Sequence, residues 1–235
     1  MFEELDYRVT PLGALSLRRR RDLSGGDDIY EIILGDEYLM SSRFTAAEIA
    51  LAKIGLGRCA DGPLDVVVGG LGLGYTAKAV LEHEGVRSLQ VVDTMAEVID
   101  WHRTGLLPLG KDLAADPRCS FVHGDFFTLA MSEAGFDPRR PGHQVDAILL
   151  DIDHSPTKLL HPDHATFYAP EGLARTRRRL RPHGVFALWS NDPPDPEFIT
   201  RLERDFREVQ AETVSFAGLS GRAGESNTVY SALAG

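Results

Sequence analysis

The strongest constraint on the fold comes from residues 66–80, VVVGGLGLGYTAKAV, where a run of β-branched residues is interrupted by glycines at alternating positions. Such a run is typical of a buried strand, and the residues after the glycines follow a helical pattern. Glycine accepts positive φ angles and leaves no Cβ between the backbone and a ligand. The stretch therefore predicts a strand, a tight turn that approaches a ligand, and a helix.

Beyond residue 64 the chain alternates between strand and helix patterns. Buried strands are predicted at residues 65–68, 88–92, 120–124, 146–150 and 184–189. Such alternation is typical of a parallel sheet with helices on both faces. Two final strands, VQAETVSF and NTVYSALA, flank the Gly-rich LSGRAGES and are expected to form a hairpin. The segments 106–118 and 135–144 are expected to be surface loops.

The first part of the chain has a different pattern. Residues 1–43 contain short strand-like runs separated by turn residues, which predicts a small β region. The helical pattern TAAEIALAKIGLG follows; Thr45 and Glu48 have the spacing of a capping box, and Gly57 is placed to end the helix. We therefore divide the chain into an N-terminal β region at 1–43 and a larger α/β domain at 44–235.

The composition limits the classes of protein that this chain can represent. Its 235 residues, 43% of them hydrophobic and 26% charged, suit one globular domain with a small appendage. The formal net charge of −10 argues against a nucleic-acid partner, because Lys and Arg provide most of that binding. The basic clusters at 18–21 and 175–181 are expected to be solvated faces.

Targeting and redox signals are also informative. The sequence has neither a signal-peptide pattern nor an apolar run of the roughly 20 residues that span a membrane, so we expect a cytoplasmic protein without membrane contact. Cys59 and Cys119 are too few for a disulfide framework and lack metal-ligand spacing. They are expected to be reduced thiols.

Acidic residues follow the next two predicted strands, at the same edge as the glycine turn. Asp93 comes 23 residues after Gly70, where a carboxylate accepts hydrogen bonds from ribose hydroxyls. Asp125 can accept from an adenine amino group, and the adjacent aromatic ring of Phe126 can cover the base. The pattern G-x-G-x-G followed by Tyr75 lacks the glycine spacing of a dinucleotide fingerprint. We predict a nucleoside ligand without a pyrophosphate, and S-adenosylmethionine fits.

With these motifs the chain resembles the spermidine synthase family of aminopropyltransferases, within the class I S-adenosylmethionine-dependent methyltransferase superfamily. The resemblance includes VVD after the glycine turn, GDFF, LLDIDHSP and FYAPEGLARTRRRLRPHGVFALW. It implies a Rossmann-like α/β fold with a seven-stranded, mostly parallel sheet and a C-terminal antiparallel hairpin, and it implies a homodimer. The predicted cofactor-binding residues are Gly70, Gly72, Leu73, Gly74, Asp93, Thr94, Asp125, Phe126 and Asp151.

Two departures from the family pattern concern the transferred group and the entrance of the active site. The family places an aspartate where this chain has Leu73, and that aspartate pairs with the ammonium of decarboxylated S-adenosylmethionine. Such a contact contributes on the order of 1.5 to 3 kcal/mol, or roughly ten- to a hundredfold in affinity. Intact S-adenosylmethionine has a carboxylate on that arm, so Leu73 favours methyl transfer. The family's Tyr-Gln-Glu stretch is here Ala46-Ala47-Glu48, which keeps only the glutamate.

Asp151 follows the fourth predicted strand, beside the expected ligand. A carboxylate there can anchor a cationic acceptor and accept the proton that an ammonium loses before its nitrogen attacks; alternatively, it caps the next turn. Tyr168 either closes over the acceptor or packs in the core. Met40, Ser41 and Ser42 are expected at the mouth of the site. The predicted catalytic residues are Asp151, Asp153, His154 and Tyr168.

A divalent metal is an alternative at this edge of the sheet. Asp151 together with Asn191 and Asp192 is similar to the cation site of catechol-type O-methyltransferases, and hard oxygen ligands suit Mg²⁺. The order Asn-Asp, the prolines that follow and the N-terminal β region depart from that family. We predict no metal.

From these observations we expect an S-adenosylmethionine-dependent transferase that moves a methyl, or aminopropyl-type, group from the sulfonium to a small, amine-bearing acceptor. Three alternatives stay open. One is a true spermidine synthase that uses decarboxylated S-adenosylmethionine and putrescine. The others are a catalytically silent nucleoside-binding protein and a metal-dependent O-methyltransferase.

Overall fold

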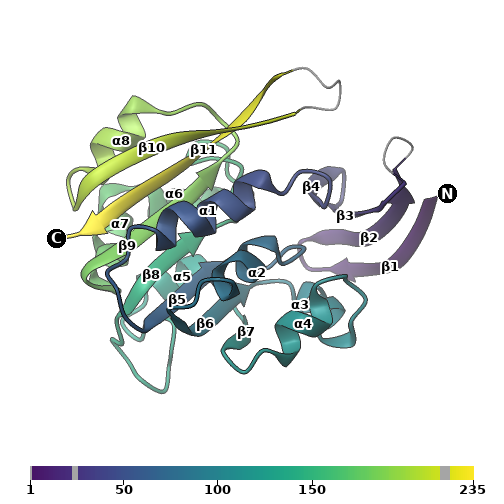
Figure 1. Ribbon diagram of the computed structural model, residues 1–235, viewed down its shortest axis with the longest axis horizontal. Coiled ribbons are helices and arrows are strands. Elements are labelled where there is room, and N and C mark those ends of the chain that lie inside the picture. Colours follow the sequence, from purple (N-terminus) through teal and green to yellow (C-terminus); the bar gives the residue numbers. More distant parts are fainter. Residues whose placement is uncertain (1, 23–25, 218–222) are drawn as a thin grey trace.

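The computed structural model describes residues 2–22, 26–217 and 223–235, and contains two sheets (Figure 1). The first sheet is antiparallel, with the strand order β1-β2-β3-β4. Its strands are β1 (Phe2–Thr10), β2 (Gly13–Arg21), β3 (Asp28–Leu34) and β4 (Glu37–Ser41). This sheet confirms the small N-terminal β region.

The second sheet has seven strands in the order β10-β11-β9-β8-β5-β6-β7. Strands β5 to β9 are parallel, whereas β11 is antiparallel to both β9 and β10. The bounds are β5 (Leu64–Gly69), β6 (Val86–Asp93), β7 (Cys119–His123), β8 (Val145–Leu150), β9 (Leu180–Ser190), β10 (Phe206–Ala217) and β11 (Ala223–Ala234). The predicted fold class is confirmed. Half of the predicted turn LSGRAGES, residues 219–222, lies outside the described residues, and its other half belongs to β11.

Helices cover both faces of the seven-stranded sheet (Figure 1). One core contains Val66 and Val68 and is completed by α1 (Ala46–Leu56), α2 (Tyr75–Leu81), α3 (Ala96–Thr104) and α4 (Gly110–Ala115). The other core contains Val67 and is completed by α5 (Phe126–Met131), α6 (Ala165–Tyr168), α7 (Pro170–Arg178) and α8 (Pro196–Leu202). Because neighbouring residues of a strand point to opposite faces, the apolar run of β5 contributes to both cores.

Two local predictions are wrong. Thr45 precedes α1, but its side chain makes no capping hydrogen bond, so the Thr45–Glu48 capping box is absent. The expected surface loop at 106–118 contains α4, and Leu107 and Leu113 in that segment are buried. The helix has only six residues, which is too short for a helical period to show in the sequence.

The N-terminal sheet lies beside the edge at which the parallel strands end (Figure 1). Met40 of β4 contacts the backbone after β5, and Asp6 of β1 accepts a 2.6 Å hydrogen bond from the indole of Trp101 in α3. The two sheets therefore share contacts at the predicted ligand edge. Among the residues that the structure describes, no helix combines the length and apolarity needed to cross a membrane.

Candidate functional site

Four neighbouring strands present the predicted site residues at one edge of the sheet. The strands lie in the order β8-β5-β6-β7. Asp151 follows β8, the glycine turn follows β5, Asp93 ends β6, and Asp125 follows β7 by two residues. In open parallel sheets, ligands bind at this edge, outside the carboxyl ends of the strands.

The glycine turn at residues 70–74 has a conformation that requires its glycines. Gly70, Gly72 and Gly74 have φ angles of +94°, +46° and +91°. A Cβ on Gly70 would lie 2.1 Å from the carbonyl oxygen of Asp151, and one on Gly72 would lie 2.7 Å from Met40 Sδ. The turn thus lies directly against the end of β8 and against the N-terminal sheet.

A histidine from α3 holds the turn from the other side. His102 Nε2 lies 2.9 Å from the carbonyl oxygen of Gly72, and the ring is fully buried. Burial lowers the pKa of His102 to about 4, although the bond to Gly72 opposes this shift. The imidazole is therefore neutral near pH 7 and donates through Nε2.

The side chains of two predicted cofactor-binding residues, Leu73 and Phe126, are buried. Leu73 is 1% exposed and packs in the core, because the turn directs its side chain inward. Phe126 is also 1% exposed, and a Cβ on Gly69 would lie 2.6 Å from its ring. Phe126 thus packs beneath the end of β5 and is not placed to cover a base.

Asp93 is buried and binds the backbone of the glycine turn. Its two oxygens accept hydrogen bonds from Leu71 N at 2.9 Å and from Met95 N at 2.8 Å. Burial raises the pKa of Asp93, and the backbone hydrogen bonds, one of them from Gly72, oppose that shift. Because a carboxylate has about four lone pairs, Asp93 keeps acceptor capacity for ribose hydroxyls. Thr94, beside it, is exposed.

Asp125 caps helix α5. Its carboxylate accepts from the backbone N–H groups of Phe127 and Thr128, at 3.1 and 3.3 Å, and its side chain is exposed. An aspartate at the end of a strand can cap the next helix in this way. This cap fixes the carboxylate at the ligand edge, with a lone pair left for a further donor.

Asp151 forms a pair of carboxylates with Glu48 of α1. Thr76 of α2 donates to Asp151 Oδ2 at 2.6 Å and lies 3.4 Å from the backbone oxygen of Glu48. Both carboxylate side chains are half-buried. Burial raises the pKa of both carboxyl groups. The charge of Asp151 raises the pKa of Glu48 further, whereas the hydrogen bond from Thr76 lowers the pKa of Asp151. Within the described ranges, neither carboxylate forms an ion pair with Lys or Arg.

Asp153 belongs to a separate, buried network. Its carboxylate accepts from Leu160 N at 2.7 Å, His164 Nδ1 at 2.8 Å and the Tyr168 hydroxyl at 2.9 Å. Tyr168 is 2% exposed, and burial raises its pKa well above the usual value, as does the charge of Asp153. Both groups therefore hold the loop after β8 in place, and their predicted catalytic roles stay predictions.

The other polar residues near the mouth are engaged with one another. His154 Nε2 lies 2.8 Å from Glu37 Oε1, which links the loop after β8 to the N-terminal sheet. The ammonium of Lys158 binds Asp192, and Asn191 Oδ1 accepts from Asn227 at 2.9 Å. Asn191 and Asp192 are thus bound to other residues, and the described residues contain no group of three His, Cys, Asp or Glu side chains that could hold a metal ion. This arrangement does not fit the metal-dependent alternative.

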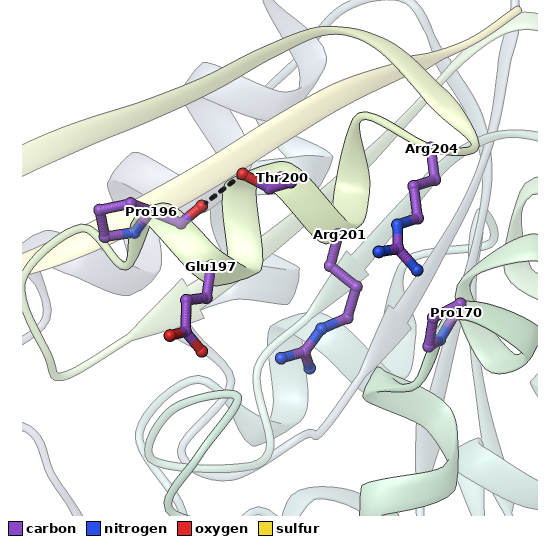
Figure 2. A pocket seen from close by; sticks show the side chains of 6 residues that line it. All are labelled: Pro170, Pro196, Glu197, Thr200, Arg201 and Arg204. Carbon is purple, nitrogen blue, oxygen red and sulfur yellow. Dashed lines mark hydrogen bonds between the residues drawn. The ribbon is translucent and has the colours of Figure 1, made fainter.

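A surface cavity of about 400 Å³ lies apart from these residues, between α8 and the start of α7 (Figure 2). Figure 2 shows Arg201 and Arg204 directed to the same side of α8, near Pro170. Arg201 Nη1 donates to the carbonyl oxygen of Tyr168 at 3.0 Å. The residues that line the cavity do not include any predicted site residue.

Comparison with known sequences gives partial matches. No family model matches the chain. It is 28% identical over 161 residues to polyamine aminopropyltransferase 2 of Pseudomonas aeruginosa, which covers 64% of this chain and 42% of the relative. It is 29% identical over 149 residues to polyamine aminopropyltransferase of Bacillus subtilis, with 63% and 49% covered. The chain thus spans less than half the length of these relatives.

Solved structures share the fold over almost the whole chain. A spermidine synthase in complex with the transition-state analogue AdoDATO has a TM-score of 0.75 and 16% identity, and the match covers 99% of this chain and 74% of that one. The Thermotoga maritima spermidine synthase has a TM-score of 0.73, also with 16% identity, covering 99% and 72%. The fold and the strand-edge site therefore define a Rossmann-like protein of the spermidine synthase fold. With the sequence matches, this confirms the predicted resemblance to the spermidine synthase-like family.

Sequence reasoning missed several groups that meet at the glycine turn. Glu48 was assigned to a helix cap, although its match to a family glutamate was a signal for a site role. Thr76 and His102 do not belong to a recognisable sequence motif. A helical residue that faces a turn has the same sequence pattern as any other buried helical residue. Met40 was expected at the mouth but not in contact with the backbone of the turn.

Proposed function

We propose that this chain is a transferase that moves an aminopropyl group from decarboxylated S-adenosylmethionine to a small amine. The names of the curated relatives support aminopropyl transfer. The sequence alone favoured methyl transfer because of Leu73. These names favour the aminopropyl alternative over that preference. The Leu73 side chain itself packs in the core.

The order of the strands supports one orientation of the donor. Adenine lies beside Asp125 after β7, and ribose lies at Asp93 after β6. The sulfonium and its arm then cross the glycine turn after β5 and point toward Asp151 after β8. The donor thus extends across the ends of β7, β6, β5 and β8, which are neighbours in the observed sheet.

The observation that carries the proposal is the pair formed by Glu48 and Asp151. Two half-buried carboxylates with raised pKa values lie together, and among the residues that the structure describes neither forms an ion pair with Lys or Arg. Like charges at short range disfavour double ionisation, and a bound cation reverses this by favouring both charged forms. An arm or acceptor with an ammonium group supplies that cation, whereas the carboxylate of intact S-adenosylmethionine would be repelled.

Asp151 also supplies the proton acceptor for the transfer. The amine nitrogen attacks the arm carbon bonded to sulfur, a C–N bond forms, and the C–S bond breaks, with its electron pair staying on sulfur in the released methylthioadenosine. The attacking nitrogen needs a free lone pair, so one ammonium proton passes to Asp151. A raised pKa makes this carboxylate a stronger base than an ordinary aspartate.

Product analysis tests the proposal. Protein is incubated with putrescine and either S-adenosylmethionine or its decarboxylated form, and products are measured by mass spectrometry. We expect spermidine and methylthioadenosine from the decarboxylated donor, and a loss of about 10²- to 10⁴-fold in rate for Asp151→Asn. Methylated putrescine as the main product would contradict aminopropyl transfer. Tight binding of methylthioadenosine with no turnover of either donor would instead identify a silent nucleoside-binding protein.

A further inference from the structure

The peptide group between Gly72 and Leu73 is held by two side chains. Its carbonyl oxygen binds His102, and its N–H, on Leu73, lies 3.2 Å from the sulfur of Met40. Met40 comes from β4 of the N-terminal sheet, so a thioether reaches across from the other sheet to the middle of the glycine turn.

Three other N–H groups of the turn, those of Gly70, Leu71 and Gly74, bind oxygen atoms. Gly70 N donates to Val92 O at 2.9 Å, and Gly74 N donates to Leu71 O at 2.8 Å. Leu71 N donates to Asp93 Oδ2 at 2.9 Å, and the N–H of Gly72 lowers the pKa of the same carboxylate. These three donors are therefore already bound to oxygen atoms of the protein.

The contact from Leu73 N to Met40 is the weakest of these, because a thioether is a poor acceptor compared with a carbonyl or carboxylate oxygen. A carboxylate near the turn would compete best for this N–H, since hydrogen bonds to charged groups are the stronger ones. Met40 occupies both the N–H and the space beside it: a Cβ on Gly72 would already lie 2.7 Å from the sulfur.

We propose that Met40 is a specificity-determining residue that excludes the carboxylate of intact S-adenosylmethionine by capping Leu73 N–H and filling the space in front of it. The inference rests on the proposed function, because it assumes that the donor arm crosses the glycine turn. Glu48 and Asp151 also disfavour the carboxylate of intact S-adenosylmethionine, but they do so through their charge, whereas Met40 acts without charge. A substitution at Met40 therefore separates the two effects.

The test measures dissociation constants for S-adenosylmethionine, decarboxylated S-adenosylmethionine and methylthioadenosine by calorimetry, in the wild-type protein, Met40→Ala and Met40→Gln. Methylthioadenosine lacks the charged arm and reports the nucleoside site alone. In Met40→Ala, the preference for the decarboxylated donor over the intact one should fall by about tenfold or more, the effect of one freed donor on a charged group. Met40→Gln provides an amide oxygen of similar reach and should keep the wild-type preference.

Controls separate this inference from the function on which it rests. Met131→Leu removes a thioether from the end of α5 and should leave the preference unchanged. If Met40→Ala does not fold, Met40→Leu removes the acceptor while keeping apolar volume and should shift the preference in the same direction. An unchanged preference in the folded variants would overturn the role of Met40 while leaving the proposed function intact. Failure of the wild-type protein to bind methylthioadenosine would overturn both.

Discussion

Thr76 sets the basicity of the proposed catalytic carboxylate. Its hydroxyl donates to Asp151 Oδ2 at 2.6 Å, and this bond lowers a pKa that burial has raised. The ionised carboxylate is the form that accepts a proton. Activity should therefore fall as the pH falls through a pKa that lies above the ordinary aspartate value of about 4.

Thr76→Val keeps the shape of the side chain and removes the donor. We expect the acidic limb of the kcat/KM profile to move to higher pH, because the ionised form of Asp151 loses a hydrogen bond. The measurement is the pH dependence of kcat/KM for both proteins. An acidic limb that stays in place in the folded variant would mean that a group other than Asp151 controls it.

At the scale of elements, the junction of β5 and α2 depends on close contact with the end of β8. Gly70 has a φ of +94°, and its missing Cβ leaves room for the carbonyl oxygen of Asp151. Gly70→Ala should destabilise the fold by more than the roughly 1–2 kcal/mol of a strained φ, and should weaken methylthioadenosine binding, because the turn must move away from Asp151.

Gly35→Ala is the matched control for this prediction. Gly35 has a φ of +59°, and a Cβ there would have no heavy atom within 4 Å. Gly35→Ala should lose stability through backbone strain alone and should bind the ligand as the wild type does. Thermal unfolding and calorimetry of both variants make the comparison, and equal effects of the two substitutions on binding would contradict the close-contact argument.

The strands and their order of appearance could be predicted because buried parallel strands are continuous apolar runs, as in β5 and β8. The site residues at strand ends followed from the same pattern. Side-chain directions could not be predicted: Leu73 and Phe126 turn inward because the path of the turn, not the residue type, decides which side faces the ligand. The pairing of Glu48 with Asp151 is long-range, and a helix-capping pattern concealed it.

At the scale of the whole molecule, a network of charges joins the amino ends of four neighbouring strands. Asp65 of β5 binds Arg87 of β6, and Arg181 of β9 binds both Asp65 and Asp146 of β8. Burial raises the pKa of Asp65, but hydrogen bonds from Arg87, Ser88 and Arg181 outweigh it and hold the pKa well below the usual value. The network lies at the edge of the sheet opposite the site.

Asp65 should therefore make stability depend on pH. A pKa lowered by folding contributes stability that is present above the unfolded value of about 4 and is lost as the pH falls toward the folded value. Asp65→Asn should lower the free energy of unfolding at pH 7 by about 1–3 kcal/mol and should flatten its decline in acid.

Denaturant unfolding at pH 7 and at a series of pH values below about 4 measures both effects. Glu171→Gln is the control, because the ion pair of Glu171 with Arg175 is exposed and should contribute less than about 1 kcal/mol. An Asp65→Asn protein with the same acid dependence as the wild type would show that other carboxylates determine it.

The reach of β4 across to the glycine turn limits how the parts of this protein can be exchanged. A small sheet that makes no contact with an active site can be replaced without a change in the reaction. Here, residue 40 of the small sheet contacts the backbone at the centre of the proposed pocket. A chimera that received its first 43 residues from another protein would also receive a new side chain at that contact. Grafting the small sheet would consequently redesign the donor pocket from outside the larger domain.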